Sequence, residues 1–217
     1  LPAEEVSSFS LQRKSYRCGI CGNHCMITSL TFSNGQKYHT GNRCERGLGR
    51  SLPDDMVPSM YAFKLKRVFD YRPLPADKAY RGEIGIPRVL NMYEDYPFWF
   101  TFFTRLGYAV TLSDKSSRRL YEKGLETIPS DSLCYPAKMA HGHILDLIEN
   151  GITKIFYPCI PYNLKEDPAA DNHYNCPVVT SYAENIRANM KVLTEKQIKF
   201  LQPFLPLDNP GRMVKRL

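Results

Sequence analysis

The stretch EIGIPRVLNMYEDYPFWFTFFTRLGYAVTLSD (83–114) contains the pattern that decides the fold. The short apolar run at 83–90 is typical of a buried strand, and 93–107 predicts a helix closed by Gly107. A second strand is predicted at 108–114. The aromatic residues of the helix predict a buried face that packs on a sheet. A strand, a helix and a strand in this order favour a parallel pair of strands.

The alternation of strands and helices continues toward the carboxyl end. We predict helices at 116–128, at 182–190 and in a long stretch that ends at Gly151, and strands at 154–158 and 177–181. This repetition predicts an α/β domain over residues 81–217, built on a Rossmann-like open parallel sheet whose strand order is left open.

Three cysteines lie at the junctions of these predicted elements. Cys134 precedes a helix opened by Pro136, Cys159 follows the strand at 154–158, and Cys176 precedes the strand predicted at 177–181. Because helix starts and strand ends meet at the carboxyl edge of an open sheet, we expect the thiols to lie together there. Three thiolates could hold a 4Fe–4S cluster with one open iron, favoured by the helix dipoles. The alternative is that they are small buried apolar residues.

Four stretches of this region carry a family resemblance. They are GIPRVLNMYEDYPFWFTFFTRLGY (85–108), ETIPSDSLCYPAKMAHGHI (126–144), IFYPCIPY (155–162) and ADNHYNCPVVTSYAENI (170–186). They resemble the activator-related proteins of the 2-hydroxyacyl-CoA dehydratase system, which are named for an acyl-CoA dehydratase activase. The similarity covers residues 81–190, and the segment looks like the part of these proteins that is similar to the dehydratase subunits.

The resemblance implies an iron–sulfur domain that receives or relays low-potential electrons. In that chemistry an ATPase activator supplies single electrons for the reductive dehydration of a 2-hydroxyacyl-CoA, and Cys134, Cys159 and Cys176 would be the cluster ligands. The implied partners are the activase ATPase domains, a dehydratase subunit and an acyl-CoA. Lys138 and His173 are candidate contacts for a CoA phosphate or the substrate, with surface or capping roles as the alternative. We expect no ATPase activity from this segment alone, because it lacks a phosphate-binding GxxxxGK[ST] motif.

A separate cysteine-rich module is predicted at 16–52, with the ligands Cys18, Cys21, Cys25 and Cys44. Its middle reads as a β-hairpin around SNGQ (33–36), in which Asn34 and Gly35 would supply positive φ angles. A ribbon this small cannot bury a core of its own, so it needs a stabilising cross-link, or staple, such as a bound metal. The spacing suits either a closed four-cysteine zinc site or a second 4Fe–4S cluster that makes an electron relay with the first.

The remaining residues complete the predicted organisation. We expect a linker at 1–15 and an irregular connection at 53–80 with a short helix near 59–69, and we expect the chain to be a segment of a longer protein. The net charge of +7 is concentrated at 64–73 and 211–217, without the aromatic pattern of an RNA-binding sheet, which favours a solvated linker and tail over nucleic acid. No apolar run is long enough to span a membrane and no signal peptide is present, so we predict a cytoplasmic location. A zinc-stapled scaffold that docks an activase or dehydratase partner, without catalysis, is the alternative function.

Overall fold

The computed structural model describes residues 9–48 and 58–217, and the chain divides into two compact units, Leu1–Ser59 and Met60–Leu217. Each unit is described by itself. The first part of the predicted linker, at 1–8, lies outside the described residues, and so do residues 49–57, where the predicted cysteine module ends and the predicted connection begins.

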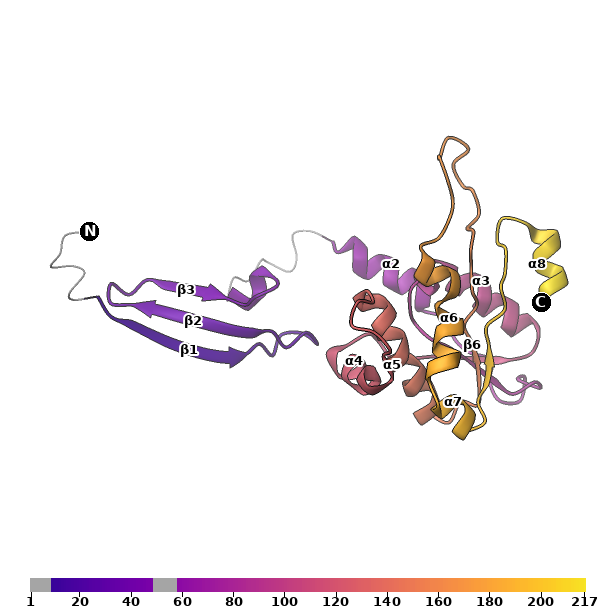
Figure 1. Ribbon diagram of the computed structural model, residues 1–217, viewed down its shortest axis with the longest axis horizontal. Coiled ribbons are helices and arrows are strands. Elements are labelled where there is room, and N and C mark those ends of the chain that lie inside the picture. Colours follow the sequence, from indigo (N-terminus) through magenta and orange to yellow (C-terminus); the bar gives the residue numbers. More distant parts are fainter. Residues whose placement is uncertain (1–8, 49–57) are drawn as a thin grey trace. The chain divides into compact units, whose positions relative to one another are not determined.

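The first unit contains a three-stranded antiparallel sheet of order β1-β2-β3 (Figure 1). Its elements are β1 (Leu11–Arg17), β2 (Met26–Phe32), β3 (Lys37–Thr40) and a 3-10 turn, η1 (Glu45–Leu48). The two strands of the predicted hairpin are present as β2 and β3. The strand β1 was not predicted, and its first residues fall in the stretch that the sequence assigned to a linker.

The turn between β2 and β3 differs from the prediction in one respect. Gly35 has a positive φ of 83°, whereas Asn34 is not among the residues with positive φ. The N–H of Gly35 donates to the carbonyl of Phe32 at 2.9 Å, which makes a tight turn followed by a glycine in the left-handed region. One glycine is therefore sufficient to close this hairpin.

The second unit is built on a four-stranded sheet of order β5-β4-β6-β7 in which all neighbours are parallel. The strands are β4 (Glu83–Ile86), β5 (Ala109–Leu112), β6 (Lys154–Phe156) and β7 (Lys199–Leu201). This confirms the predicted α/β class with a parallel sheet. The chain moves outward from β4 to β5 and then returns across β4 to β6. Such a reversal places the crevice that commonly binds ligands at the carboxyl ends of β4 and β6.

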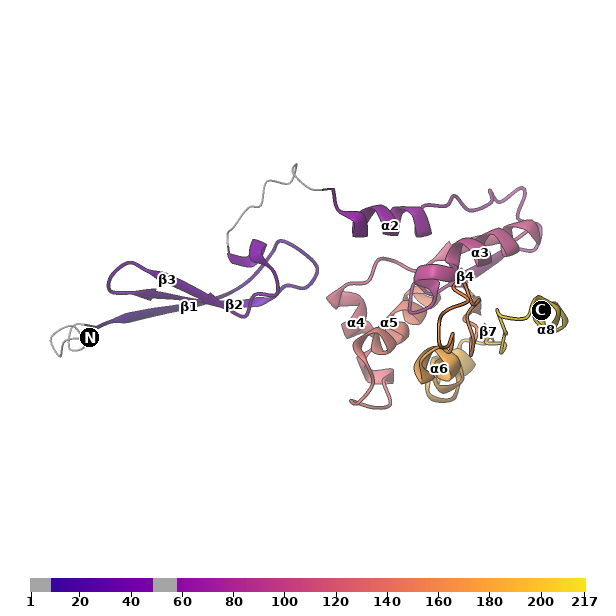
Figure 2. The same cartoon turned by 90° about the horizontal axis from the view of Figure 1, so that it is seen from above.

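Helices cover both faces of this sheet. The helical elements of the second unit are α2 (Met60–Phe69), α3 (Met92–Arg105), α4 (Arg118–Gly124), the 3-10 turn η2 (Leu125–Thr127), α5 (Tyr135–Glu149), α6 (Pro177–Asn189), α7 (Val192–Glu195) and α8 (Pro210–Arg216). In Figure 2 the strands β4 and β7 lie between α3 on one side and α6 on the other. Right-handed crossovers explain this arrangement, because the direction of strand addition reverses after β5.

The aromatic helix α3 packs on the sheet as predicted. Trp99 is fully buried, and its ring lies 4.7 Å from that of Phe156 in β6. Phe103, one turn later, lies 4.8 Å from the same ring. The helix ends before Gly107, whose φ of 85° is a conformation that side chains other than glycine rarely adopt. The spacing of these rings along one helix face thus anchors α3 to the centre of the core.

Three expectations for the second unit need correction or extension. Residues 177–181, predicted as a strand, form the first part of α6, because Pro177 starts the helix directly after an extended residue. The strand β7 and the helix α7 were not predicted. Part of the predicted solvated tail forms α8, while the short helix predicted near 59–69 is present as α2. No helix in the described ranges has the length and apolar character that a membrane crossing requires.

Candidate functional site

Cys134 is the N-cap residue of α5. Its backbone is extended, with φ −63° and ψ 150°, and Pro136 occupies the first turn of the helix, where a missing N–H has no cost. The exposed side chain makes no capping hydrogen bond to the described residues of the helix. The sulfur of Cys134 therefore does not cap the helix that it precedes.

Cys176 repeats this geometry at the start of α6. Its backbone has φ −62° and ψ 156°, Pro177 is the first helical residue, and the exposed side chain again makes no capping hydrogen bond to this described helix. Two helices that connect strands of the same sheet, α5 and α6, are thus each preceded by a cysteine with the same backbone conformation. Their N-terminal backbone N–H groups favour negatively charged groups nearby.

Cys159 follows β6 in the part of the chain that continues the sheet. Its N–H donates to the carbonyl of Pro203 at 2.9 Å, and its carbonyl accepts from the N–H of Leu205 at 2.9 Å. The side chain is fully buried. Burial is the largest influence on its thiol and raises the pKa of Cys159 to about 11, against the opposing effect of the Glu184 backbone N–H.

The loop between Cys159 and Cys176 returns to its starting point as a narrow hairpin, which projects above α6 in Figure 1. At its base the N–H of Asn175 donates to the carbonyl of Pro161 at 3.0 Å. The side-chain Nδ2 of Asn175 donates to the carbonyl of Ile160 at 2.9 Å. Because Ile160 follows Cys159 and Asn175 precedes Cys176, this base brings the two cysteines near each other.

Cys134 is brought to the same edge by the packing of α5 on α6. His141 Nε2 and the Tyr182 hydroxyl are 2.7 Å apart, and these residues lie about two turns after Cys134 and Cys176, respectively. Both helices connect parallel strands, so both run opposite to the strands and begin at the carboxyl edge of the sheet. The two N-cap cysteines therefore lie at the same end of the unit.

A buried tyrosine, Tyr157, lies two residues before Cys159. Tyr157 is almost fully buried, and burial is the main reason that its pKa is raised far above the ordinary value. The next contributions, which act in the same direction, come from Cys159, Tyr182, Cys176 and Cys134. These contributions agree with the placement of the three cysteines at one edge of the sheet, which the backbone geometry establishes.

The three cysteines at this edge are not arranged to hold a single metal ion in the described residues. Within residues 9–48 and 58–217, no group of three or more His, Cys, Asp or Glu side chains is arranged to hold one metal ion. A cluster binds each cysteine to a different iron, so its ligands do not need to converge on one point. Three thiols at one sheet edge, two of them at helix N-termini, are compatible with that requirement.

Comparison with known families gives one match. A family model described as "CoA enzyme activase uncharacterised domain" matches residues 83–217, from the first residue of β4 onward. The chain belongs to this family. The match confirms the resemblance to activase-related proteins, and it includes all three cysteines at the sheet edge. No curated protein and no solved structure matches the chain.

Two further predicted residues of the CoA enzyme activase domain have local partners. The Nζ of Lys138 donates to the carbonyl of Asp131 at 2.7 Å, which ties the loop before Cys134 to the first turn of α5. His173 lies in the hairpin loop, with its ring 5.8 Å from that of Tyr162. It lines a cavity of about 480 Å³ together with residues that include Asp95. Lys138 thus holds the loop before Cys134, whereas His173 lines a cavity that has no cysteine among its described lining residues.

Sequence reasoning missed a buried polar network beside this edge. His143 Nδ1 lies 2.8 Å from Ser113 Oγ, and His143 Nε2 lies 3.0 Å from Ser116 Oγ. Burial lowers the pKa of His143 to about 4, so the ring is neutral at pH 7. Ser113 comes directly after β5 and Ser116 lies in the loop that follows, and polar residues at this position were the available signal.

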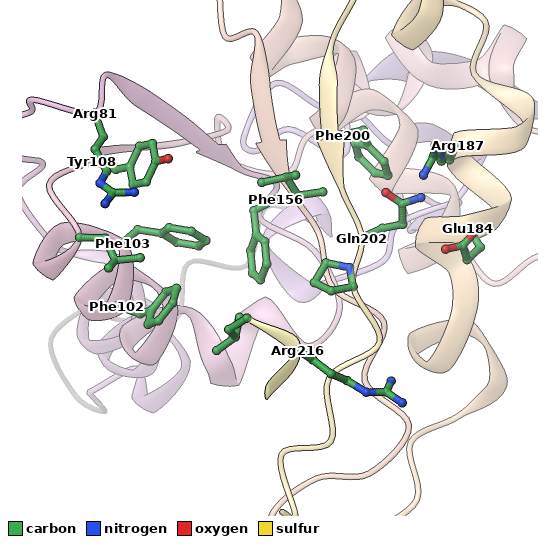
Figure 3. A pocket seen from close by; sticks show the side chains of 14 residues that line it. Arg81, Phe102, Phe103, Tyr108, Phe156, Glu184, Arg187, Phe200, Gln202 and Arg216 are labelled. Atoms are coloured by element: carbon green, nitrogen blue, oxygen red, sulfur yellow. The ribbon is translucent and has the colours of Figure 1, made fainter. Parts of the chain in front are cut away.

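A cavity of about 580 Å³ beside β6 and β7 is a separate feature (Figure 3). The rings of Phe102 and Phe103 of α3 and of Phe156 line it, and Arg187 of α6 lies at its polar side. No cysteine is among the described residues that line it. This cavity is therefore distinct from the cysteine-bearing edge of the CoA enzyme activase domain.

In the first unit, two of the four predicted metal-binding cysteines face each other across β1 and β2. Arg17 pairs with Met26 at the end of the ladder, and the N–H of Cys18 donates to the carbonyl of Cys25 at 2.8 Å. Cys21 lies in the loop that joins them. The loop end of this hairpin therefore carries three cysteines.

The strand β3 leads Cys44 toward the same end. Thr28 pairs with Thr40, the last residue of β3. Gly41 follows with a φ of 85°, and its Cα lies so close to the carbonyl of Met26 that no Cβ could be accommodated. Cys21 and Cys44 are exposed and Cys18 is buried. The sheet thus gathers the four cysteines at one end, while their side chains do not form a site for a single ion in this described segment.

Proposed function

We propose that the CoA enzyme activase domain of this chain binds a 4Fe–4S cluster through Cys134, Cys159 and Cys176. We further propose that it receives or relays low-potential electrons for the ATP-dependent reductive dehydration of a 2-hydroxyacyl-CoA. The observation that carries this proposal is the placement of three cysteines at the carboxyl edge of the sheet, two of them at the starts of α5 and α6 and one after β6. The membership of the chain in a CoA enzyme activase family supports the reaction context.

The chain's own residues would have different tasks in holding the cluster. Cys134 and Cys176 would bind from helix N-termini, whose dipoles favour negative charge. Cys159, whose thiol is protonated at neutral pH, would release a proton when it becomes a ligand. Tyr157, which is buried, would exclude water from one side. When bound, the cluster would supply one-electron transfer and an open iron for an oxygen ligand.

The proposed partners follow from the same context. They are activase ATPase domains, a dehydratase subunit and an acyl-CoA. The exposed positions of Cys134 and Cys176 support an approach of such partners from the carboxyl edge of the sheet. Lys138, half-buried and bonded to the loop of Cys134, is proposed to orient that loop and to offer a positive charge to a CoA phosphate.

The cysteines of the first unit are proposed as a second metal centre. Cys18, Cys21, Cys25 and Cys44 would hold either a second 4Fe–4S cluster or a zinc ion. The small buried core of this unit supports the proposal. Every residue of β1 is exposed, and the described buried hydrophobic residues of the unit are Cys18 and Ile27. A sheet with so little buried apolar surface needs an additional source of stability.

A zinc-stapled scaffold is the second candidate function. It is favoured by the same small core of the first unit, and it assigns no redox role to Cys134, Cys159 and Cys176. In this alternative the α/β unit docks an activase or dehydratase partner. Serine substitution of these three cysteines would then change little except stability.

Metal content separates the two functions. The chain would be expressed and purified without oxygen, and iron, acid-labile sulfide and zinc would be measured per chain. About eight irons support two clusters, and about four irons support one. In the second case, Cys134→Ser and Cys44→Ser show which site holds the cluster. One zinc and no iron would overturn the redox proposal in favour of the scaffold.

A further inference from the structure

A cavity of about 670 Å³ lies in the second unit, where α2 covers the loops that follow β4 and β5. Three of its lining residues are cationic, namely Arg88, Lys66 and Lys115. Arg88 follows β4 and Lys115 follows β5, so the cavity lies at the carboxyl edge of the sheet, where open α/β sheets commonly bind ligands.

Arg88 is the central polar group of this cavity. Its backbone N–H donates to Ser113 Oγ at 2.8 Å, and its guanidinium lies over the ring of Phe69, 4.7 Å from the centroid. The Nε atom is buried and has no hydrogen-bond partner among the described residues. Burial lowers the pKa of Arg88, and Asp114 opposes this effect only as a minor influence. A partly buried cation with an unpaired N–H is stabilised by an anion that accepts from it.

The other charges of the lining leave an excess of positive charge. Lys66 comes from α2 and Lys115 from the loop after β5, and neither side chain forms an ion pair with a carboxylate in the part of the chain that the structure describes. Asp70 is the only carboxylate among the described lining residues. Three cations against one carboxylate suit a phosphate, which carries up to two negative charges, better than a singly charged group.

Ser116 adds a neutral hydrogen-bonding group whose position is fixed. Its Oγ lies 3.0 Å from His143 Nε2 and 3.2 Å from the hydroxyl of Tyr93. Since His143 is buried and neutral at pH 7, it holds the hydroxyl without adding a charge. His143 is thus a positioning residue for one wall of the cavity.

The size and the apolar lining indicate more than an inorganic ion. A volume of about 670 Å³ lies in the range of small-molecule sites and exceeds the volume of a single phosphate. The rings of Tyr61, Phe69 and Tyr93 line the cavity beside the cations. Aromatic walls of this kind pack against flat or apolar organic groups.

We propose that this cavity binds a phosphate ester. Arg88, Lys66, Lys115 and Ser116 hold the phosphate, and the organic part of the ligand packs against Tyr61 and Tyr93. The inference goes beyond the proposed electron relay and uses none of its cysteines, so either proposal can fail while the other stands.

Isothermal titration of the full chain with inorganic pyrophosphate and with ADP tests the assignment. Both probes are expected to bind, and ADP is expected to bind more tightly because its ring system contacts the aromatic wall. Arg88→Gln is expected to weaken the binding of both by about 10- to 100-fold, as for the loss of a charged hydrogen-bond donor. Lys66→Gln is expected to weaken it by several-fold.

Arg67→Gln and Lys64→Gln are the matched controls. They remove the same charge from the same helix, but these residues do not line the cavity. Both controls are expected to bind within about twofold of the original chain. Three results overturn the proposal: no binding of either probe at millimolar concentration, equal weakening by the controls, or unchanged binding in Arg88→Gln. ADP binding no tighter than pyrophosphate overturns the role of the aromatic wall.

Discussion

The thiol of Cys159 differs from the thiols of Cys134 and Cys176 in its access to water. Cys159 is fully buried with a pKa raised to about 11, whereas the other two side chains are exposed. In the metal-free chain at pH 8, iodoacetamide is therefore expected to alkylate Cys134 and Cys176 at least about tenfold faster than Cys159. Peptide mass spectrometry after a short reaction measures this ratio. Equal alkylation of all three thiols would contradict the buried position of Cys159.

Two buried histidines predict how stability depends on pH. Burial lowers the pKa of His141 and of His143 to about 4, whereas the unfolded chain binds these protons near pH 6.5. Between these values the unfolded state binds more protons, so stability is full above pH 6.5 and is lost as the pH falls toward 4. At pH 5 each histidine is expected to lower the free energy of unfolding by on the order of 2 kcal/mol relative to neutral pH.

Urea unfolding at pH 7.5 and at pH 5 measures this effect through Trp99, the single tryptophan, which is fully buried in the second unit. His143→Asn should show a smaller loss between the two pH values than the original chain. Asp95 has the opposite effect on the pH dependence of stability. Burial raises its pKa to about 6, so the folded state binds more protons than the unfolded state between pH 3.8 and 6, and stability falls as the pH rises through this range. A loss that is identical in both chains would contradict the assignment to His143.

The positions of Cys134 and Cys159 could be predicted from the sequence, but the helix start at Cys176 and the polar network could not. Cys134 and Cys159 were placed correctly at a helix start and after a strand, because Pro136 and the apolar run at 154–158 mark those elements locally. The partners of His143 lie about thirty residues earlier in the chain, at the end of another strand. No local pattern shows that pairing, since it depends on how α5 packs beside β5.

At the scale of elements, α4 and α5 pack closely because two glycines meet. A Cβ on Gly142 would overlap the carbonyl oxygen of Leu120, and a Cβ on Gly124 would come within 2.5 Å of the Gly142 nitrogen. Gly142→Ala is therefore expected to destabilise the second unit by about 2–4 kcal/mol, although alanine is the better helix former. The Trp99 fluorescence of the unfolding transition measures this change.

Gly211→Ala is the matched control for that substitution. Gly211 also lies in a helix, α8, and a Cβ at this position would have the Asn209 side-chain oxygen as its nearest neighbour at 3.6 Å, an ordinary contact. The control is expected to be neutral or to stabilise the chain by up to about 1 kcal/mol. Equal effects of the two substitutions would contradict a close approach of α4 and α5.

The elements that were predicted correctly have strong local periodicity, and those that were missed do not. The helix α3 has apolar residues at helical spacing and a closing glycine, and both signals agree with its packing. Residues 177–181 contain β-branched residues that favour strands, yet Pro177 and the apolar spacing of Tyr182 and Ile186 continue them into α6. The strand β7 has three residues and too little pattern to be recognised.

At the scale of the whole molecule, the two units differ in what stabilises them. The second unit has a large aromatic and aliphatic core, whereas the first has almost none among its described residues. If a metal centre staples the first unit, a strong chelator is expected to expose Lys14 in β1 and Lys37 in β3 to trypsin by at least about tenfold, while Trp99 fluorescence stays unchanged. Cys44→Ser should show the same exposure without chelator. Unchanged cleavage in both cases would contradict the staple.

The proposed function depends on a redox-active cluster held by Cys134, Cys159 and Cys176. The most direct measurement is the electron paramagnetic resonance spectrum of the dithionite-reduced chain, purified without oxygen, in the Cys44→Ser background that removes one ligand of the first unit. A reduced-cluster signal is expected to persist in this background and to be lost when Cys176→Ser is added. A signal that is absent in Cys44→Ser, or that is unchanged by Cys176→Ser, would contradict the claim.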